Sequence, residues 1–266
     1  MKRSAYRRVG LVVVLLNLAA CALGLAGPAQ ADEQAVAARA ISEKVGDAVV
    51  TVRVAVKFRM SFEGEEGEEE ENTNETRATV IDPSGLAVCS LAEVDPSHLL
   101  KMMREEDPSY KIETQITGMK LVLAQGKEIP AKVVLRDQDL DLAFIRPEQP
   151  QTEPLVAVDL AQAAEPQLMD ELVIVGRLGE AANRTVSTAL DRITAVVKKP
   201  RRLYIAGVNT WIAGMGCPAF ALDGKVIGIT VMRAIPRASG SSDSSNSMPV
   251  LLPAADILKV SKQASG

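Results

Sequence analysis

Apolar residues recur at every second position in many short runs of this chain, and this alternation restricts its fold more than any other feature. In the clearest run, residues 48–60, Val50, Val52, Val54 and Val56 alternate with mostly polar side chains. A period of two is typical of a strand that buries one face. Many such runs, with turns between them, predict an all-β fold rather than alternating strands and helices.

Further strands are expected wherever the same kind of short apolar run returns. They cover residues 77–88, 112–116, 119–124, 131–135, 172–176, 185–197, 203–208 and 225–232, and residues 140–146 close the first group. Asp82-Pro83-Ser84-Gly85 is a turn within the first of these segments. Residues 147–154, rich in Pro, Gln and Glu, are typical of a linker. We therefore expect two packed β-barrels, over about residues 46–147 and 154–253.

Helices are expected at three places. Residues 33–45 carry Ala, Val and Ile at helical spacing, and residues 254–262 form a terminal helix. A further helix begins at Pro96 and runs to Arg104, with Asp95 as its N-cap.

Three polar stretches are predicted to be loops. Residues 63–75 are dominated by Glu and Gly and cannot form a core, so we expect a mobile loop there. The spacing of its carboxylates is irregular, and we therefore expect no metal site. Residues 198–202, Lys-Lys-Pro-Arg-Arg, are predicted to be an exposed hairpin tip, with binding of an anion as the less favoured alternative. Residues 237–247 are expected to be a Gly/Ser loop.

The N-terminus has the organisation of a targeting segment. Four basic residues precede an apolar stretch at residues 9–26, and Ala29-Gln30-Ala31 then supplies a signal-peptidase pattern. We predict a signal peptide over residues 1–31 and a mature chain over residues 32–266, located in the periplasm or outside the cell. Two alternatives are an uncleaved membrane anchor and a lipoprotein, because Leu18-Ala19-Ala20-Cys21 resembles a lipoprotein box in which Cys21 carries the lipid.

The charge balance excludes one class of partner. The formal net charge is −4, and loss of the leader makes it −8, so no basic excess favours a nucleic acid. Aromatic residues are only 3 % of the chain, so Val, Ile, Leu, Ala and Met must fill its core. Two cysteines, Cys89 and Cys217, remain in the mature chain, in a compartment that permits disulfides. No cofactor is expected.

Three stretches in order carry a resemblance to the trypsin-like serine proteases, specifically the bacterial HtrA type. They are Ile-Asp-Pro-Ser-Gly-Leu-Ala-Val-Cys-Ser-Leu-Ala-Glu-Val at 81–94, Arg-Asp-Gln-Asp-Leu-Asp-Leu-Ala-Phe-Ile at 136–145 and Gly-Met-Gly-Cys-Pro-Ala-Phe-Ala-Leu-Asp-Gly-Lys-Val-Ile-Gly-Ile at 214–229. Residues 250–253, Val-Leu-Leu-Pro, resemble the last strand of that family. The resemblance spans about residues 35–262 and implies two packed six-stranded β-barrels, trypsin/chymotrypsin-like, with short terminal helices and no PDZ domain.

The resemblance also implies that the catalytic triad is degenerate. Ala92 stands at the position of the catalytic His and Met215 at that of the nucleophilic Ser, whereas Asp141 matches the catalytic Asp. In triad chemistry an imidazole takes the proton of the hydroxyl and the carboxylate only orients that imidazole. Ala213 and Cys217 also replace glycines of the oxyanion loop. We therefore expect no serine-triad catalysis.

Three functional hypotheses follow from these departures. The first, which we favour, is an exported pseudo-protease whose former substrate cleft binds a peptide or protein, as a binding or scaffolding module of the cell envelope. The second is an active endopeptidase that uses Cys217 or Ser90 as its nucleophile, with His98, the single histidine, as base. The third is a structural envelope protein. The family often forms trimers, but no pattern in this chain predicts an oligomeric state.

The resemblance places both cysteines beside the former active site. Cys89 precedes Ala92 and Cys217 follows Met215, so each would come from a different barrel. A disulfide between Cys89 and Cys217 that joins the barrels is therefore one hypothesis, and two buried free thiols are the other.

Overall fold

The computed structural model describes residues 33–62, 65–95, 110–234 and 247–264. Four expected features fall wholly or mostly outside these ranges: the signal peptide with Cys21, the helix from Pro96 to Arg104, His98, and the Gly/Ser loop at 237–247. The described residues from Ala37 onward belong to one folded unit, and of the unit that precedes it, Met1–Val36, only the start of a helix is described.

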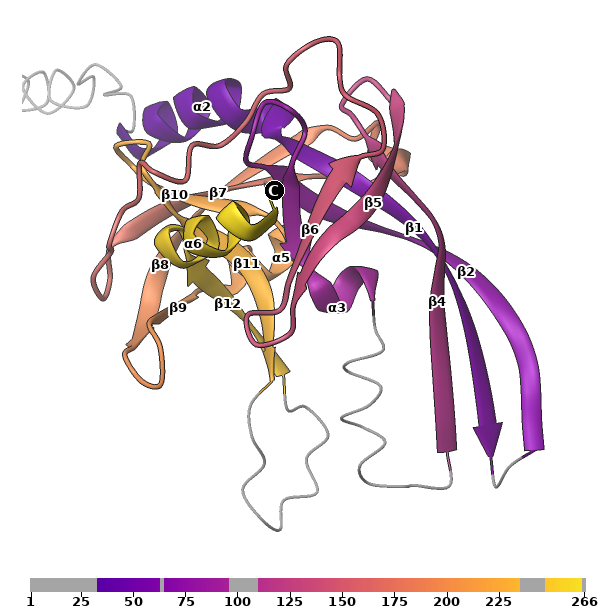
Figure 1. Cartoon of the computed structure of the whole chain (residues 1–266). Coiled ribbons are helices and arrows are strands. Elements are labelled where there is room, and N and C mark those ends of the chain that lie inside the picture. Colours follow the sequence, from indigo (N-terminus) through magenta and orange to yellow (C-terminus); the bar gives the residue numbers. More distant parts are fainter. Residues whose placement is uncertain (1–32, 63–64, 96–109, 235–246, 265–266) are drawn as a thin grey trace, which may run out of the picture. The chain divides into compact units, whose positions relative to one another are not determined.

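Two closed antiparallel barrels of six strands each make up the fold, which confirms the predicted all-β architecture (Figure 1). The first has the strand order β1-β2-β3-β6-β5-β4, and its strands are β1 (Val49–Phe62), β2 (Glu65–Val80), β3 (Ala87–Ser90), β4 (Tyr110–Val122), β5 (Glu128–Asp137) and β6 (Leu142–Pro147). The second has the order β10-β11-β12-β9-β8-β7, and its strands are β7 (Glu171–Arg177), β8 (Val186–Val197), β9 (Leu203–Ala206), β10 (Pro218–Ala221), β11 (Val226–Ala234) and β12 (Ser247–Pro253).

Short helices accompany the barrels. They are α2 (Glu33–Val45), α3 (Leu91–Val94), α5 (Val208–Ala213) and α6 (Ala254–Ala264), with 3-10 turns η1 (Gly46–Ala48) and η2 (Glu180–Ala182). The two terminal helices match the prediction, whereas α3 and α5 were not expected. Asp95 does not start a helix among the described residues: it ends α3, and its N–H donates to the Leu91 carbonyl at 2.8 Å. None of the helices in the described part of the chain is long and apolar enough to cross a membrane.

Each barrel has its own apolar core, and a third cluster lies between the barrels. The alternating valines Val50, Val52, Val54 and Val56 all point into the first barrel, as their spacing predicts. The intervening cluster takes residues from β3, β6, β7, β11 and β12, together with α2 and α6. The two barrels therefore pack through continuous apolar contact and not through a solvated gap.

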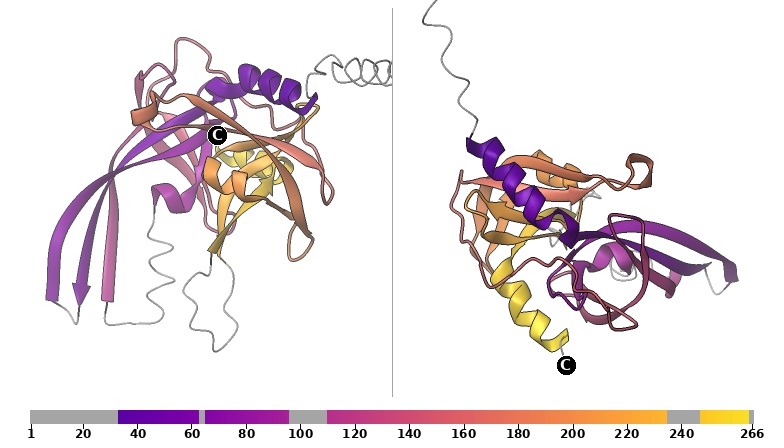
Figure 2. Two further views of the ribbon diagram at one scale, coloured as in Figure 1. Left: turned by 180° about the vertical axis from the view of Figure 1, so that it is seen from behind. Right: turned by 90° about the horizontal axis from the view of Figure 1, so that it is seen from above.

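The acidic stretch is where the sequence prediction was wrong. Residues 65–75 are not a loop: they form most of β2, which pairs with β1 along its length (Figures 1 and 2). Cations on β1 face the carboxylates across the sheet, and Glu69 accepts from both Lys57 and Arg59 at 2.9 Å. Cross-strand ion pairs of this kind offset the low strand propensity of Glu. Composition alone missed them because the cations are separated in sequence from the acidic run.

Strand β4 corrects a second expectation. The segments 112–116 and 119–124 were predicted as separate strands, but β4 is continuous from Tyr110 to Val122. Its pairing with β1 shifts by one residue between Ala55 and Val56, opposite Gly118. A bulge of this kind absorbs an extra residue without ending the strand, so the glycine marks an irregularity and not a turn.

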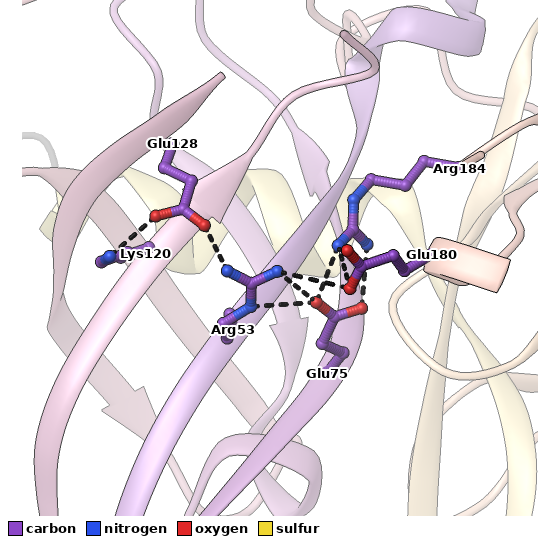
Figure 3. A network of polar contacts seen from close by, with 6 residues as sticks. All are labelled: Arg53, Glu75, Lys120, Glu128, Glu180 and Arg184. Atoms are coloured by element: carbon purple, nitrogen blue, oxygen red, sulfur yellow. Dashed lines mark hydrogen bonds and ion pairs between the residues drawn. The ribbon is translucent and has the colours of Figure 1, made fainter. Parts of the chain in front are cut away.

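An ion network crosses from one barrel to the other (Figure 3). Arg184, which follows η2 in the second barrel, binds both carboxylate oxygens of Glu75 on β2, at 2.8 and 2.9 Å. Glu75 also accepts from Arg53 on β1, which in turn pairs with Glu128 on β5. The Arg184 hydrogen bonds lower the pKa of Glu75 despite partial burial. Arg184 is 6 % exposed whereas Glu75 is exposed, so this bidentate pair is shielded from solvent on the arginine side only.

A second arginine satisfies the backbone where the barrels meet. Arg177, at the end of β7, is 2 % exposed, and its guanidinium donates to the carbonyls of Val49, of Gly46 (2.6 Å) and of Arg184 (2.7 Å). The Asp47 carboxylate lies 3.3 Å away. A buried carbonyl without a donor destabilises the fold, so this one side chain completes the hydrogen bonding of η1, the start of β1 and the β7–β8 connection.

We predict that Arg177→Met lowers the free energy of unfolding by about 3 kcal/mol or more, because it removes a buried donor that bonds three backbone carbonyls. The measurement is urea unfolding followed by circular dichroism. Arg192→Met is the matched control, because Arg192 is half-exposed and pairs with Glu171 at the surface, where ion pairs contribute little. A loss for Arg177→Met no larger than that of the control would contradict this role.

Candidate functional site

The three residues that the sequence places at triad positions come from three different connections. Ala92 lies in α3, directly after β3, and Asp141 lies in the turn that precedes β6. Met215 lies between α5 and β10 in the second barrel. Asp141 adopts a left-handed backbone conformation with φ 57°, which Asp tolerates better than most residues.

The Asp141 carboxylate joins the two barrels. Its Oδ1 accepts the N–H of Ala92 at 2.8 Å, and its Oδ2 accepts the N–H of Met232, on β11 of the second barrel, at 2.8 Å. The Ser90 hydroxyl also donates to Oδ2. The structure therefore brings Ala92 and Asp141 into contact, and the carboxylate binds backbone of both barrels through its own oxygens.

Burial raises the pKa of Asp141 to about 6, although the hydrogen bonds from Ser90, Ala92 and Met232 act in the opposite direction. The nearby charge of Glu93 adds to the rise. Near neutral pH the group is mostly ionised, as its three donors require. Asp141 therefore binds a proton around pH 6. A solvent-exposed aspartate would bind one only at a lower pH, near the ordinary pKa of 3.8.

The loop that holds Met215 is tightly fixed. Gly216 donates its N–H to the Thr230 carbonyl at 2.7 Å, and its own carbonyl accepts the Thr79 hydroxyl at 2.7 Å. Gly216 has φ 75°, and a Cβ there would lie 2.0 Å from the Arg77 carbonyl oxygen. Only glycine fits this position. Met215 is 7 % exposed, so its thioether fills space between elements and is not presented at the surface.

Ala213 and Cys217 do not disrupt the fold around this loop. Ala213 is the last residue of α5, and Gly214 follows it with φ 93° as the C-cap. Asp191 holds the start of the helix, because its carboxylate accepts both the N–H and the hydroxyl of Thr210, at 2.9 and 3.1 Å.

The hypothesis of a disulfide is not borne out: Cys89 and Cys217 are free thiols in this structure, and both are completely buried. Cys89 belongs to the core of the first barrel, and its Sγ lies 3.9 Å from the Ala143 carbonyl. Cys217 belongs to the core of the second barrel, and its Sγ lies 3.3 Å from the Ala213 carbonyl. Each side chain packs into its own barrel, although their backbones both border the seam.

The environment of each thiol disfavours the thiolate that a nucleophilic cysteine needs. Burial raises the pKa of Cys217 to about 12, against a smaller opposing effect of the Arg77 charge, and burial raises that of Cys89 further. A nucleophilic cysteine needs a lowered pKa and access to substrate. Ser90, the other candidate nucleophile, is buried, and its hydroxyl donates a hydrogen bond to the Asp141 carboxylate.

The described residues were also expected to hold no metal site and a basic hairpin tip. No group of His, Cys, Asp and Glu residues suited to a metal occurs among the described residues, and the basic tip at 198–202 borders an open depression together with Leu168. Arg202 at this tip pairs with Glu165, so part of its charge is already compensated.

Sequence reasoning missed two members of this region. Arg77 lies between the barrels beside Gly214 and Gly216, and Met232 supplies the backbone donor to Asp141. A basic residue on a predicted strand gives no sign of where its side chain will go. A backbone N–H carries no sequence signal at all, so only the register of β11 locates it.

The raised pKa of Asp141 predicts a specific pH effect. Protonated Asp141 is favoured in the folded state, so its contribution to stability is fully present below the ordinary pKa of 3.8 and is lost as the pH rises through about 6. We expect the difference in unfolding free energy between wild type and Asp141→Asn to shrink by about 1–2 kcal/mol from pH 4.5 to pH 7. Urea unfolding at both pH values measures it, and a constant difference contradicts the assignment.

The two thiols provide another test. In the native protein, iodoacetamide should leave Cys89 and Cys217 unmodified because both are fully buried. After unfolding without a reductant, both should be alkylated, as peptide mapping by mass spectrometry can show. Cysteines that stay unmodified until a reductant is added would instead establish the disulfide.

Comparison with known proteins agrees with the geometry. The model of the trypsin-like peptidase domain matches residues 76–229, more than half of the chain. Among solved structures, the protease domain of MamO from Magnetospirillum magneticum, in its apo form, is similar with a TM-score of 0.53 and 15 % identity. The match covers 82 % of this chain and 97 % of that one, and at this identity it shows the fold alone. No curated protein sequence matches the chain. The family match and the two six-stranded barrels together show that the chain belongs to the trypsin-like peptidase domain family.

Proposed function

We propose that this protein is an exported, HtrA-type member of the family that does not cleave peptides and that binds an extended polypeptide beside its degenerate site. One observation carries the proposal. The Asp141 carboxylate is bonded to the backbone of Ala92 and Met232, one from each barrel, and so acts as a structural link where the family needs an orienting group for a base.

The chemistry of the neighbouring side chains supports the loss of hydrolysis. The methyl group of Ala92 cannot take up a proton, and the thioether of Met215 cannot attack a carbonyl. The alternative, a Cys217 nucleophile, needs a thiolate that reaches substrate, whereas the Cys217 thiol is buried with a pKa of about 12. A peptidase based on Cys217 is therefore disfavoured.

The pairing of β11 supports a binding role. On one side β11 pairs with β12 up to Ala234, but on the other it pairs with β10 only as far as Ile229. Beyond that point Thr230 bonds the loop at Gly216, and Met232 donates to Asp141. By the alternation of an antiparallel strand, the Met232 carbonyl and the Ala234 N–H face this same side, on which no strand among the described residues pairs with them. An extended peptide can add as a strand to such an edge.

The place of action follows from the leader. Basic residues, an apolar stretch and Ala29-Gln30-Ala31 favour export, with lipidation of Cys21 as the alternative. We propose that the partner is a peptide or protein outside the cytoplasm. A purely structural envelope role remains the competing hypothesis, and binding of an unfolded polypeptide separates the two.

The test uses residues 32–266 with fluorescein-labelled, unfolded casein. We expect binding, seen as increased fluorescence anisotropy, and no cleavage by wild type or by Cys217→Ala on a denaturing gel. Ala234→Pro removes the N–H on the side of β11 that faces away from β12 and should weaken binding about ten-fold. Ala255→Pro is the matched control, because an exposed position in the first turn of α6 tolerates proline.

Each contrary result has a distinct meaning. Cleavage that disappears in Cys217→Ala makes the protein a cysteine peptidase. Cleavage that persists in Cys217→Ala shows that a residue other than Cys217 is the nucleophile. Absence of both binding and cleavage favours the structural role.

A further inference from the structure

Arg77 is the charged group at the seam whose role the fold does not explain. It lies on β2, paired with Thr51 of β1, and its Nε donates to the backbone carbonyl of Arg177 at 3.0 Å. Arg177 is itself immobilised by its buried hydrogen bonds. One nitrogen of the Arg77 guanidinium is therefore held by the second barrel, and the plane of the group is fixed.

The two terminal nitrogens of this guanidinium differ from those of the neighbouring arginines. Within the described residues, neither Nη atom makes a hydrogen bond or an ion pair, although Arg177, Arg184 and Arg53 nearby all have theirs. Arg77 is half-buried, and its Nη atoms do not count among the buried unsatisfied nitrogens of the structure. They can therefore be reached from solvent, on a side chain whose stem is packed between the barrels.

The packing around Arg77 leaves it little freedom. Its carbonyl oxygen lies 2.0 Å from the position that a Cβ on Gly216 would occupy, so the two backbones are in close contact. Its Nη1 lies 3.1 Å from the corresponding position on Gly214. Glycines at both positions let the guanidinium lie directly against the loop that holds Met215. A group ordered before binding loses little entropy when a ligand arrives.

We infer that Arg77 is a binding site for a carboxylate of the polypeptide that occupies the degenerate site, an inference that rests on the proposed function. The Nε atom of this guanidinium is held by the Arg177 carbonyl, and its two Nη atoms present parallel N–H groups. Such a pair of donors can bind both oxygens of one carboxylate. No carboxylate of the described residues lies within ion-pair distance of it, which leaves the guanidinium able to accept a carboxylate from a ligand.

The carboxylate has two possible sources in a polypeptide: the C-terminus or an Asp or Glu side chain. The first would make this protein a receptor for chain ends, and the second would make it a receptor for internal acidic segments. Both require the same guanidinium, and ligands that carry only one of the two groups distinguish them.

The test uses three fluorescent octapeptide libraries and the exported protein. The first library lacks Asp and Glu and has a free C-terminal carboxylate, the second is the same but amidated, and the third is amidated and contains Asp and Glu. We expect the wild type to bind the first or the third library at least about ten-fold more tightly than the second. The library that binds identifies the source of the carboxylate.

Variants then assign the preference to Arg77. Arg77→Met should reduce binding of the preferred library about ten-fold and leave the amidated acid-free library unchanged, whereas Arg192→Met should bind as wild type does. Arg77→Lys keeps the positive charge but lacks the paired N–H donors of a guanidinium, so its affinity for the preferred library should lie between those of the wild type and Arg77→Met. Thermal melting checks that the variants fold. If Arg77→Met does not fold, Arg77→Lys provides the test, and its affinity for the preferred library should be at least about three-fold lower than that of the wild type.

The outcomes separate this inference from the proposed function. Equal binding of all three libraries, or a preference that Arg77→Met and Arg77→Lys leave intact, overturns the carboxylate site while polypeptide binding stands. No binding of any library by the wild type overturns both.

Discussion

The buried guanidinium of Arg177 is the interaction on which the arrangement of the two barrels depends. It gives the carbonyls of Gly46, Val49 and Arg184 their donor in a place that water does not reach, and its own backbone carbonyl orients Arg77. Apolar contact between barrels is not directional, but hydrogen bonds to a rigid planar group are. The apolar cluster brings the barrels together, and the arginine fixes how they meet.

The seam that results is held by hydrogen bonds that need neither an imidazole nor a serine hydroxyl at the triad positions. In this chain Asp141 binds the backbone of both barrels, and Thr79 binds the Gly216 carbonyl across the same boundary. None of these bonds involves an imidazole, and all of them form with Ala92 at the position that the resemblance assigns to the histidine. Hydrogen bonds between the two barrels therefore maintain the geometry around Asp141 and fix the loop that holds Met215.

Much of the fold was accessible from local pattern. The four alternating valines of β1 predicted both a strand and its buried face, and the turn at Asp82 and Gly85 closes as expected, with the Gly85 N–H donating to the Asp82 carbonyl at 2.9 Å. The acidic strand was missed because its stability comes from Lys57 and Arg59 on another strand. Composition describes the charge of a segment, but pairing decides whether that charge is neutralised.

The sequence by itself determined the β architecture and the absence of an imidazole and a hydroxyl at the expected triad positions, because periodicity and side-chain chemistry are local properties. Only the tertiary structure decided which way each thiol points, what the Asp141 carboxylate binds, and that Arg77 donates through Nε to the carbonyl of Arg177. These depend on the register of strands far apart in the chain and on close packing at the seam. A difference of one residue in register would turn Cys89 and Arg77, which lie on strands, to the other face of the sheet.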